Sequence, residues 1–292
     1  MSPQPDAAVR VALVTGAARG IGAATVLALV EAGWHVVATD RCADDPALRY
    51  PLGSRAELDA VVARANGSAD SPADDRWADT DGTVRTGAGT ALKAVAVVAD
   101  TRDAQALARA VDTARTAFGG LDAVVAAAGV VGGGVPLWEM PDDEVSAVLD
   151  VNLTGAVTAA RVCLPVVLER PSPRSGRFVA VASAAATRGL AMLAAYCAAK
   201  AGVTGLVRGL AAELRGTGVT ANAVSPGSTD TPILAESARL YGLEDAASFA
   251  PQQPIERLIR PEEVAAAIRW LLSAEAAAVT GATFAVDGGL SL

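Results

Sequence analysis

The sequence predicts a doubly wound α/β fold, in which helices cover both faces of a seven-stranded parallel sheet. Short apolar runs alternate with longer helical patterns along the 292 residues. The short runs are apolar throughout, as in strands that are buried on both faces. A hydrophobic content of 52% provides for one large core, and a chain of this length commonly forms one α/β domain. We therefore expect a single domain over residues 1–292.

The elements follow one another in alternation. We expect strands at 11–14, 35–39, 95–99, 121–127, 178–182, 219–224 and 283–286. We expect helices at 21–32, about 103–117, 195–214 and 261–272, with one or two more inside 141–168. A further helix is predicted to begin at Ser54, because Ser54 and Glu57 have the spacing of a capping box. Ligands of such a sheet bind beyond the carboxyl ends of its strands.

Composition excludes several classes of function. The net charge of −8 argues against nucleic acid or an anionic membrane as the main partner. Cys42, Cys163 and Cys197 are too few and too scattered for a disulfide framework or a metal site, so we expect no metal and a reducing cytoplasm. Residues 1–6 lack the pattern of a signal peptide. The uncharged run 123–138 is too short and too rich in glycine to span a bilayer.

A glycine-rich turn follows the first predicted strand. Residues 15–22, TGAARGIG, open the first helix with the spacing G-x-x-x-G-x-G. Glycines at such a turn let the backbone approach a pyrophosphate, which the helix N-terminus then stabilises. A purely structural turn is the alternative. The position between strand and helix favours dinucleotide binding.

Asp40 ends the second predicted strand, at about the 20-residue spacing that dinucleotide sites show. A carboxylate there accepts hydrogen bonds from an adenosine ribose and repels a 2′-phosphate. This favours NAD over NADP. Arg19 and Arg41 are evidence against it, because either could face a 2′-phosphate. The alternative is that Asp40 only caps a turn.

Tyr196 and Lys200 lie four positions apart, on one face of the predicted helix 195–214. A phenol holds its proton to about pH 10. A neighbouring ammonium favours the phenolate, so we expect the pKa of Tyr196 to be lowered toward values useful for acid–base chemistry. The pair alone is a weak signal and depends on its context.

Together these motifs resemble the short-chain dehydrogenase/reductase family, which has a Rossmann-type fold, and the resemblance covers most of the chain. It implies a cofactor loop at residues 15–22, in which Gly16, Arg19, Gly20 and Ile21 contact NAD. It also implies that Asp40 and Arg41 flank the adenosine ribose. The remaining residues that it assigns to the cofactor are Asp100, Thr101, Ala127, Gly129, Tyr196, Lys200, Pro226, Gly227, Thr229 and Thr231.

The same resemblance implies a catalytic set. Asn152 is similar to the family's asparagine that holds a water in the proton relay, and Ser183 follows the fifth strand as the catalytic serine does. Tyr196, as phenolate, would take the hydroxyl proton of an alcohol while hydride leaves for the nicotinamide. Lys200 would lower the tyrosine pKa and hold the nicotinamide ribose. Ser183 would stabilise charge on the substrate oxygen.

One motif departs from the family. The stretch N-N-A-G that usually follows the fourth strand reads AAAG at residues 126–129. The missing asparagines normally brace neighbouring strands, so sheet stability or cofactor ordering is in doubt here. Backbone contacts at Ala127 and Gly129 remain available, and we expect activity to be retained.

The connection 41–93 is much longer than one crossover helix requires. Within it, residues 66–90 are rich in Asp, Gly, Ser and Thr, which predicts a mobile insertion. A surface loop without function is the alternative. Residues 40–44, DRCAD, and 50–52, YPL, resemble the subgroup of the family associated with mycofactocin, which includes carveol dehydrogenase. That resemblance implies that the insertion folds over NAD and prevents its exchange, with mycofactocin as the external acceptor.

Three functions remain open. The first is an NAD-dependent dehydrogenase of a hydrophobic secondary alcohol, because the apolar stretch at about 232–256 corresponds to the family's substrate lid. The second is an NADPH-dependent carbonyl or 3-ketoacyl reductase. The third is a cofactor-binding regulator without catalysis, against which the complete catalytic set argues. The resemblance also implies a homotetramer, with the closing segment 279–289 in subunit contacts.

Overall fold

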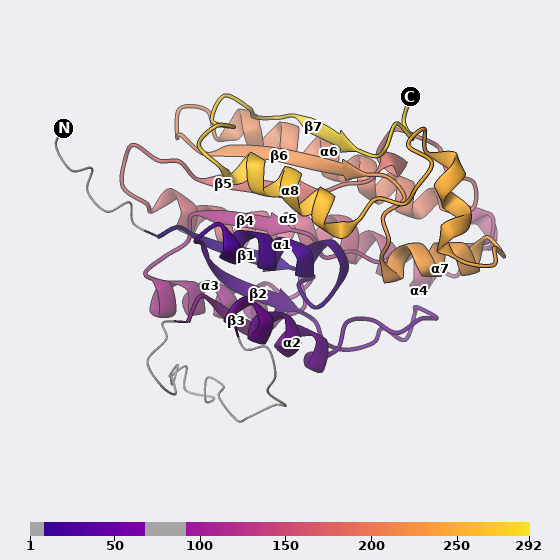
Figure 1. Ribbon diagram of the computed structural model, residues 1–292, viewed down its shortest axis with the longest axis horizontal. Helices are drawn as coiled ribbons and strands as arrows, with labels where there is room; N and C mark the ends of the chain where they lie inside the picture. Colours follow the sequence, from indigo (N-terminus) through magenta and orange to yellow (C-terminus); the bar gives the residue numbers. More distant parts are fainter. Residues whose placement is uncertain (1–8, 68–91) are drawn as a thin grey trace.

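The computed structural model describes residues 9–67 and 92–292, and in this part seven strands form one parallel sheet (Figure 1). The strand order is β3-β2-β1-β4-β5-β6-β7. The strands are β1 (Val11–Thr15), β2 (His35–Asp40), β3 (Ala94–Val98), β4 (Ala123–Ala126), β5 (Arg177–Val181), β6 (Thr220–Pro226) and β7 (Thr283–Val286). The predicted doubly wound fold is confirmed. The winding reverses between β1 and β4, which is the place where such sheets bind ligands.

Helices cover both faces of the sheet (Figure 1). One face carries α1 (Gly20–Glu31), α2 (Arg55–Ala65) and α8 (Pro261–Leu272), and the other carries α3 (Ala104–Phe118), α5 (Gly155–Leu168) and α6 (Ala194–Glu213). The side chains of β1 alternate between the two layers. Val11 and Leu13 pack with α3 and α5, whereas Ala12 and Val14 pack with α1 and α8. Burial on both faces explains why this strand is apolar from Val11 to Val14.

The strand ends are aligned by the register of the sheet. Thr15, the last residue of β1, lies opposite Thr39 of β2 and Ala126 of β4. Val181, at the end of β5, lies opposite Val224 of β6. The turns that follow these strands therefore meet along one edge of the sheet.

The helix predicted after the second strand is confirmed by its cap. Ser54 Oγ accepts a hydrogen bond from the Glu57 backbone N–H at 3.2 Å, and the Ser54 N–H donates to Glu57 Oε2 at 2.7 Å. This reciprocal pair satisfies two of the free N–H groups at the start of α2. The mobile insertion that we predict over 66–90 falls, from residue 68 on, outside the described residues.

The predicted helical stretch 141–168 consists of α4 (Asp142–Leu149), a π-helical turn (Asp150–Thr154) and α5. By length and by its mean hydropathy of 1.6 this stretch would suit a membrane span. Ala159, Cys163 and Val167 of α5 are fully buried in the core on one face of the sheet. Packing inside the fold accounts for the apolar character.

Candidate functional site

A cavity of about 560 Å³ opens at the edge where the strands end. It joins the loops after β1, β2, β3, β4, β5 and β6 to α6, to α7 (Pro232–Leu240) and to a 3₁₀ turn, η4 (Ala246–Gln252). Of the residues predicted to bind cofactor or to act in catalysis, those that line this cavity are Gly16, Arg19, Gly20, Ile21, Asp40, Arg41, Asp100, Thr101, Ala127, Gly129, Ser183, Tyr196, Lys200, Pro226, Gly227, Thr229 and Thr231. Asn152 is the predicted residue that does not line it.

The glycine turn after β1 packs directly on the loop after β4. A Cβ at Gly16, whose φ is +66°, would lie 2.6 Å from the Ala128 Cα. Thr15 Oγ1 accepts hydrogen bonds from the N–H groups of Ala127 and Ala128, both at 3.1 Å. The loop that lacks the family's asparagines is therefore held by the threonine that precedes the glycine turn. Thr15 has this bracing role in addition to its predicted place as the first residue of the cofactor loop.

Asp40 connects the glycine turn to the segment after β2. Its Oδ2 accepts from the Ala18 N–H at 3.1 Å, and its Oδ1 accepts from the Cys42 N–H at 3.2 Å. A Cβ at Gly53 would lie 3.0 Å from Oδ1. Asp40 thus caps a local turn and also lines the cavity, so the two interpretations of this residue are compatible.

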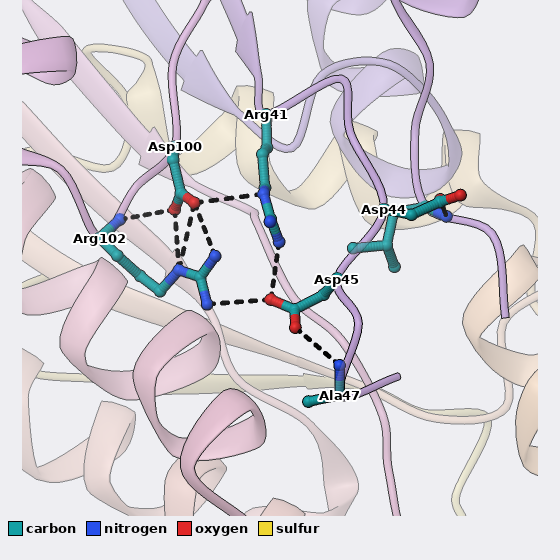
Figure 2. A network of polar contacts seen from close by, with 7 residues as sticks. Arg41, Asp44, Asp45, Ala47, Asp100 and Arg102 are labelled. Carbon is teal, nitrogen blue, oxygen red and sulfur yellow. Dashed lines mark hydrogen bonds and ion pairs between the residues drawn. The ribbon is translucent and has the colours of Figure 1, made fainter. Parts of the chain in front are cut away.

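Arg19 and Arg41, the two arginines that the sequence places near Asp40, have partners within the chain. Arg19 Nη2 donates to the Pro51 carbonyl at 2.5 Å, and Arg19 Nη1 lies 3.9 Å from the Glu57 carboxylate. Arg41 Nη1 donates to Asp45 Oδ2 at 2.7 Å, and Arg41 Nε lies 3.3 Å from Asp100 Oδ2 (Figure 2). The charge of Arg41 is therefore offset by two carboxylates, whereas Arg19 is held by a neutral carbonyl and a more distant carboxylate.

The segment after β2 forms part of the cavity wall. Tyr50, Leu52 and Gly53 line the cavity. The Tyr50 hydroxyl accepts a hydrogen bond from the Val131 N–H at 3.0 Å, and its ring packs in a small apolar cluster with Val130. Burial raises the pKa of Tyr50 well above that of a free phenol. This phenol therefore stays protonated and has a structural part in the wall.

Tyr196 and Lys200 share one face of α6, as their spacing predicts. Lys200 Nζ lies 5.7 Å from the centroid of the Tyr196 ring and donates to the Val181 carbonyl at 2.9 Å. Lys200 is 4% exposed. The contact with Val181 anchors α6 to the end of β5, which is also the strand that leads to Ser183.

Burial dominates the proton affinities of this pair. It raises the pKa of Tyr196 to about 12, against the opposing effect of a hydrogen bond with Ser183. It lowers the pKa of Lys200 to about 8, because an ammonium loses its hydration there. The lowered phenol pKa expected from the sequence is wrong for this geometry. The spacing places a cation beside the phenol, but it does not reveal that Lys200 is buried and that Tyr196 is half-buried at the cavity wall.

Ser183 and Asn152 are held by the backbone around them. Ser183 Oγ accepts from the Ala185 N–H at 3.1 Å, at the start of the 3₁₀ turn η3 (Ala184–Ala186). Asn152 lies in the π-helical turn, where its Nδ2 donates to the carbonyls of Val130 and Val148, both at 2.8 Å. Asn152 is 2% exposed, and its side chain supports the loop after β4 from outside the cavity. π-Helical turns occur frequently at functional sites.

Gln253 supports the loop after β6 and carries no motif in the sequence. It is 1% exposed, and its Oε1 accepts from the Ser228 N–H at 2.9 Å. A Cβ at Gly227 would lie 2.4 Å from the same oxygen. Sequence reasoning missed Gln253 because its contact is tertiary and no local pattern points to it.

The far end of the cavity is mainly apolar. Tyr241 donates its hydroxyl hydrogen to the Ala191 carbonyl at 2.7 Å, and its ring meets Phe249 edge-on with centroids 6.1 Å apart. Ile233, Leu234 and Leu243, from the same stretch 232–256, also line the cavity. Arg188 also lines the cavity, with its Nη1 donating to the Leu290 carbonyl at 2.6 Å.

Comparisons with known proteins agree with this geometry. Residues 10–66 match the family model described as short chain dehydrogenase, and residues 73–291 match that described as Enoyl-(Acyl carrier protein) reductase. The chain is 38% identical over 282 residues to a cis-4-hydroxycyclohexanecarboxylate dehydrogenase from Sinomonas cyclohexanicum, covering 96% of each chain. It is 32% identical over 295 residues to a (-)-trans-carveol dehydrogenase from Rhodococcus erythropolis, covering 97% of this chain and 98% of that one. A crystal structure of a short chain dehydrogenase from Mycobacterium paratuberculosis bound to NAD is similar with a TM-score of 0.80, 29% identity and 97% of each chain covered.

Proposed function

Because this chain belongs to the short-chain dehydrogenase/reductase family and acts as an oxidoreductase on CH–OH groups, we propose that it interconverts a hydrophobic secondary alcohol and its ketone with NAD. One observation supports this most directly. Ser183, Tyr196 and Lys200 line the same cavity as the glycine turn at Gly16 and Gly20. Acid–base groups and a dinucleotide cradle therefore face one space.

The residues of the cradle fit a dinucleotide. The glycine turn has no Cβ where the backbone must come close to a ligand, and it opens the N-terminus of α1, which favours a pyrophosphate. Asp40 lines the cavity at the end of β2, where a carboxylate accepts hydrogen bonds from a ribose. A bound nicotinamide supplies the hydride acceptor for alcohol oxidation.

The chain's own residues would handle the proton. We assign the phenol oxygen of Tyr196 as the group that exchanges a proton with the substrate hydroxyl, and the Ser183 hydroxyl as the donor that stabilises charge on that oxygen. Lys200, with a pKa of about 8, is charged near neutral pH and is held by the Val181 carbonyl beside the Tyr196 ring. Because burial raises the pKa of Tyr196 to about 12, the phenol carries its proton near neutral pH and can donate it to a ketone oxygen. The family resemblance is what assigns Asn152 to the proton relay; in this structure its amide is bonded to the backbone of Val130 and Val148, so its side chain supports the loop after β4.

The pairing of the arginines supports NAD over NADP. Arg19 and Arg41 were the evidence for a 2′-phosphate, and each has a partner within the chain. Asp40 adds a negative charge at the ribose end. The NADPH-dependent carbonyl or 3-ketoacyl reductase is accordingly the second candidate, and the non-catalytic regulator the third.

We extend the proposal to cofactor retention and to the acceptor. The segment that bears Tyr50 and Leu52 forms one wall of the cavity and is tied to the loop after β4. This contact supports a cofactor that stays bound through several turnovers. An external acceptor must then reoxidise it, and the resemblance to the carveol dehydrogenase group favours mycofactocin.

The substrate end of the cavity favours an apolar ring or chain. Leu234, Leu243 and Phe249 provide the apolar contacts. Arg188 also lines the cavity, and because its partner is the neutral Leu290 carbonyl its charge suits a carboxylate on the substrate. The Sinomonas relative bears the name of a dehydrogenase for a hydroxycyclohexanecarboxylate, a compound that combines both features.

We also propose a cytoplasmic homotetramer. β7 is an edge strand of the sheet, and Trp270 of α8 beside it is 41% exposed, so apolar surface is available there for subunit contact. Light scattering coupled to size-exclusion chromatography measures the assembly directly.

The test of function is oxidation of a panel of secondary alcohols by the unaltered chain and by Tyr196→Phe, with an artificial electron acceptor included. We expect Tyr196→Phe to lose activity by about 10²–10⁴-fold. We expect its dissociation constant for NAD to change little, because the phenyl ring remains. Equal activity of the two proteins would overturn the assignment of Tyr196, and absence of any dinucleotide binding would overturn the function itself.

A further inference from the structure

Asp45 lies behind the ribose end of the cavity and has no assigned role. Asp45 is 6% exposed. Its Oδ2 accepts hydrogen bonds from Arg41 Nη1 at 2.7 Å and from Arg102 Nη1 at 3.0 Å (Figure 2). Its Oδ1 accepts from the Ala47 N–H at 3.1 Å. Both oxygens are therefore in use, and Asp45 is not among the residues that line the cavity.

Two arginines and two aspartates are linked to one another by ion pairs: Arg41, Asp45, Asp100 and Arg102. Arg102 binds Asp100 through Nε at 3.1 Å and Nη2 at 2.7 Å, while Arg41 bridges Asp45 and Asp100. Burial acts to raise the pKa of Asp45 and of Asp100, but the hydrogen bonds from their partners outweigh it and lower both values. Two carboxylates thus remain ionised beside two guanidinium groups.

The position of Arg41 connects these four charged residues to the choice between NAD and NADP. Arg41 follows Asp40 directly, lines the same cavity, and belongs to the residue type that best binds a phosphate through paired hydrogen bonds. An unpaired arginine at this point would favour a cofactor with a 2′-phosphate. Here Asp45 and Asp100 occupy two nitrogens of its guanidinium group.

We propose that Asp45 is a specificity-determining residue, which excludes NADP by holding the Arg41 guanidinium away from a 2′-phosphate. Exclusion then has two layers. Asp40 repels the phosphate, and Asp45 withholds the cation that would compensate for it. Asp45 acts through Arg41 and is a positioning residue. This inference rests on the proposed dinucleotide-dependent function.

The test measures dissociation constants for NAD and NADP by calorimetry on protein freed of any retained dinucleotide. In the Asp45→Asn variant we expect the preference for NAD over NADP to fall about tenfold, the range of one charge-assisted hydrogen bond. We expect a larger fall when Asp45→Asn is combined with Asp40→Ser than the two single changes predict together. The coupling arises because the released arginine binds best when no carboxylate opposes the phosphate.

A matched control uses the second ion pair of the same spacing. Asp59 accepts from Arg55 Nε at 2.7 Å on α2, four positions along the helix. Asp59→Asn removes one negative charge from the neighbourhood, as Asp45→Asn does, without releasing Arg41. We expect it to leave the ratio of the two dissociation constants unchanged. A fall of the same size in both variants would overturn the proposal, since net charge alone would explain it.

A second variant does not depend on how Asp45→Asn folds. In the otherwise unaltered chain, Arg41→Lys keeps the cation beside Asp45 and Asp100 but removes the paired hydrogen bonds that a guanidinium offers to a phosphate. It is expected to leave the ratio of the two dissociation constants unchanged, because Arg41 does not reach the phosphate there. A tenfold loss of NADP affinity relative to NAD in Arg41→Lys would overturn the proposal. Failure of the unaltered protein to bind either dinucleotide would overturn the proposed function and this inference with it. Normal NAD binding with an unchanged ratio in Asp45→Asn would overturn the inference alone.

Discussion

Replacing Lys200 with methionine should remove a pH dependence of stability that the buried ammonium creates. Burial lowers the pKa of Lys200 from 10.5 to about 8. Below pH 8 the folded and unfolded chains both hold the proton, and the folded chain bears the full cost of a buried charge. Between about pH 8 and pH 10.5 only the unfolded chain holds it. The unfolded state then binds more protons, so stability rises with pH across that window.

The displacement of the Lys200 pKa sets the size of the effect. At about 1.4 kcal/mol for each pH unit, the displacement from 10.5 to about 8 corresponds to about 3 kcal/mol in total. About 2 kcal/mol of this should be recovered between pH 7 and pH 10. The raised pKa of Tyr196, about 12, acts in the opposite direction above pH 10, because there the unfolded chain loses a proton that the folded chain keeps. Measurements should therefore stop at pH 10.

The assay is urea denaturation of the unaltered chain and of Lys200→Met at pH 7 and at pH 10. Methionine has a similar length and no charge, and its loss of the hydrogen bond to the Val181 carbonyl is the same at both pH values. We expect the free energy of unfolding of Lys200→Met, relative to the unaltered chain, to fall by about 2 kcal/mol on going from pH 7 to pH 10. An equal change in the free energy of unfolding of both proteins between pH 7 and pH 10 would refute the claim that Lys200 is a buried, desolvated ammonium.

Four further changes test other parts of the site. Ser183→Ala should lower kcat by about 10²–10³-fold while thermal unfolding stays unchanged, since it removes one donor to the substrate oxygen; an unchanged kcat would exclude that role. Gly16→Ala should abolish dinucleotide binding in calorimetry, because its Cβ would lie 2.6 Å from Ala128 at a φ of +66°. Thr15→Val should lower the free energy of unfolding by about 1 kcal/mol, because the part-buried Ala128 N–H loses its acceptor while the Ala127 N–H keeps the Val125 carbonyl; chemical denaturation measures this, and Thr116→Val on the exposed surface of α3 is the control. Arg188→Ala should raise KM about tenfold for a carboxylated alcohol and leave KM for its uncharged analogue unchanged.

Much of the fold is readable from local patterns. β1 is apolar from Val11 to Val14 because helices pack on both faces of the sheet there, and such a pattern is visible in the sequence alone. The start of α2 is equally local, since Ser54 and Glu57 satisfy one another within a single turn. The shared face of Tyr196 and Lys200 follows from helix geometry.

Other features depend on contacts between distant segments. The pKa of Tyr196 is governed by burial, which no spacing of residues reveals. The state of Arg41 depends on Asp100, which β3 brings to it from far along the chain. Gln253 supports the loop after β6 without a motif of its own. Local chemistry therefore predicts which residues meet at the site, whereas their protonation and partners follow from the tertiary structure.

The cavity is proposed to hold NAD and to retain it. The most direct measurement is mass spectrometry of the small molecules released when protein purified without added cofactor is denatured. We expect NAD or NADH in near-stoichiometric amount and no NADP. Release of NADP would contradict the roles of Asp40 and Asp45. A protein that releases no dinucleotide and turns over only with added NAD would contradict retention by the segment that bears Tyr50.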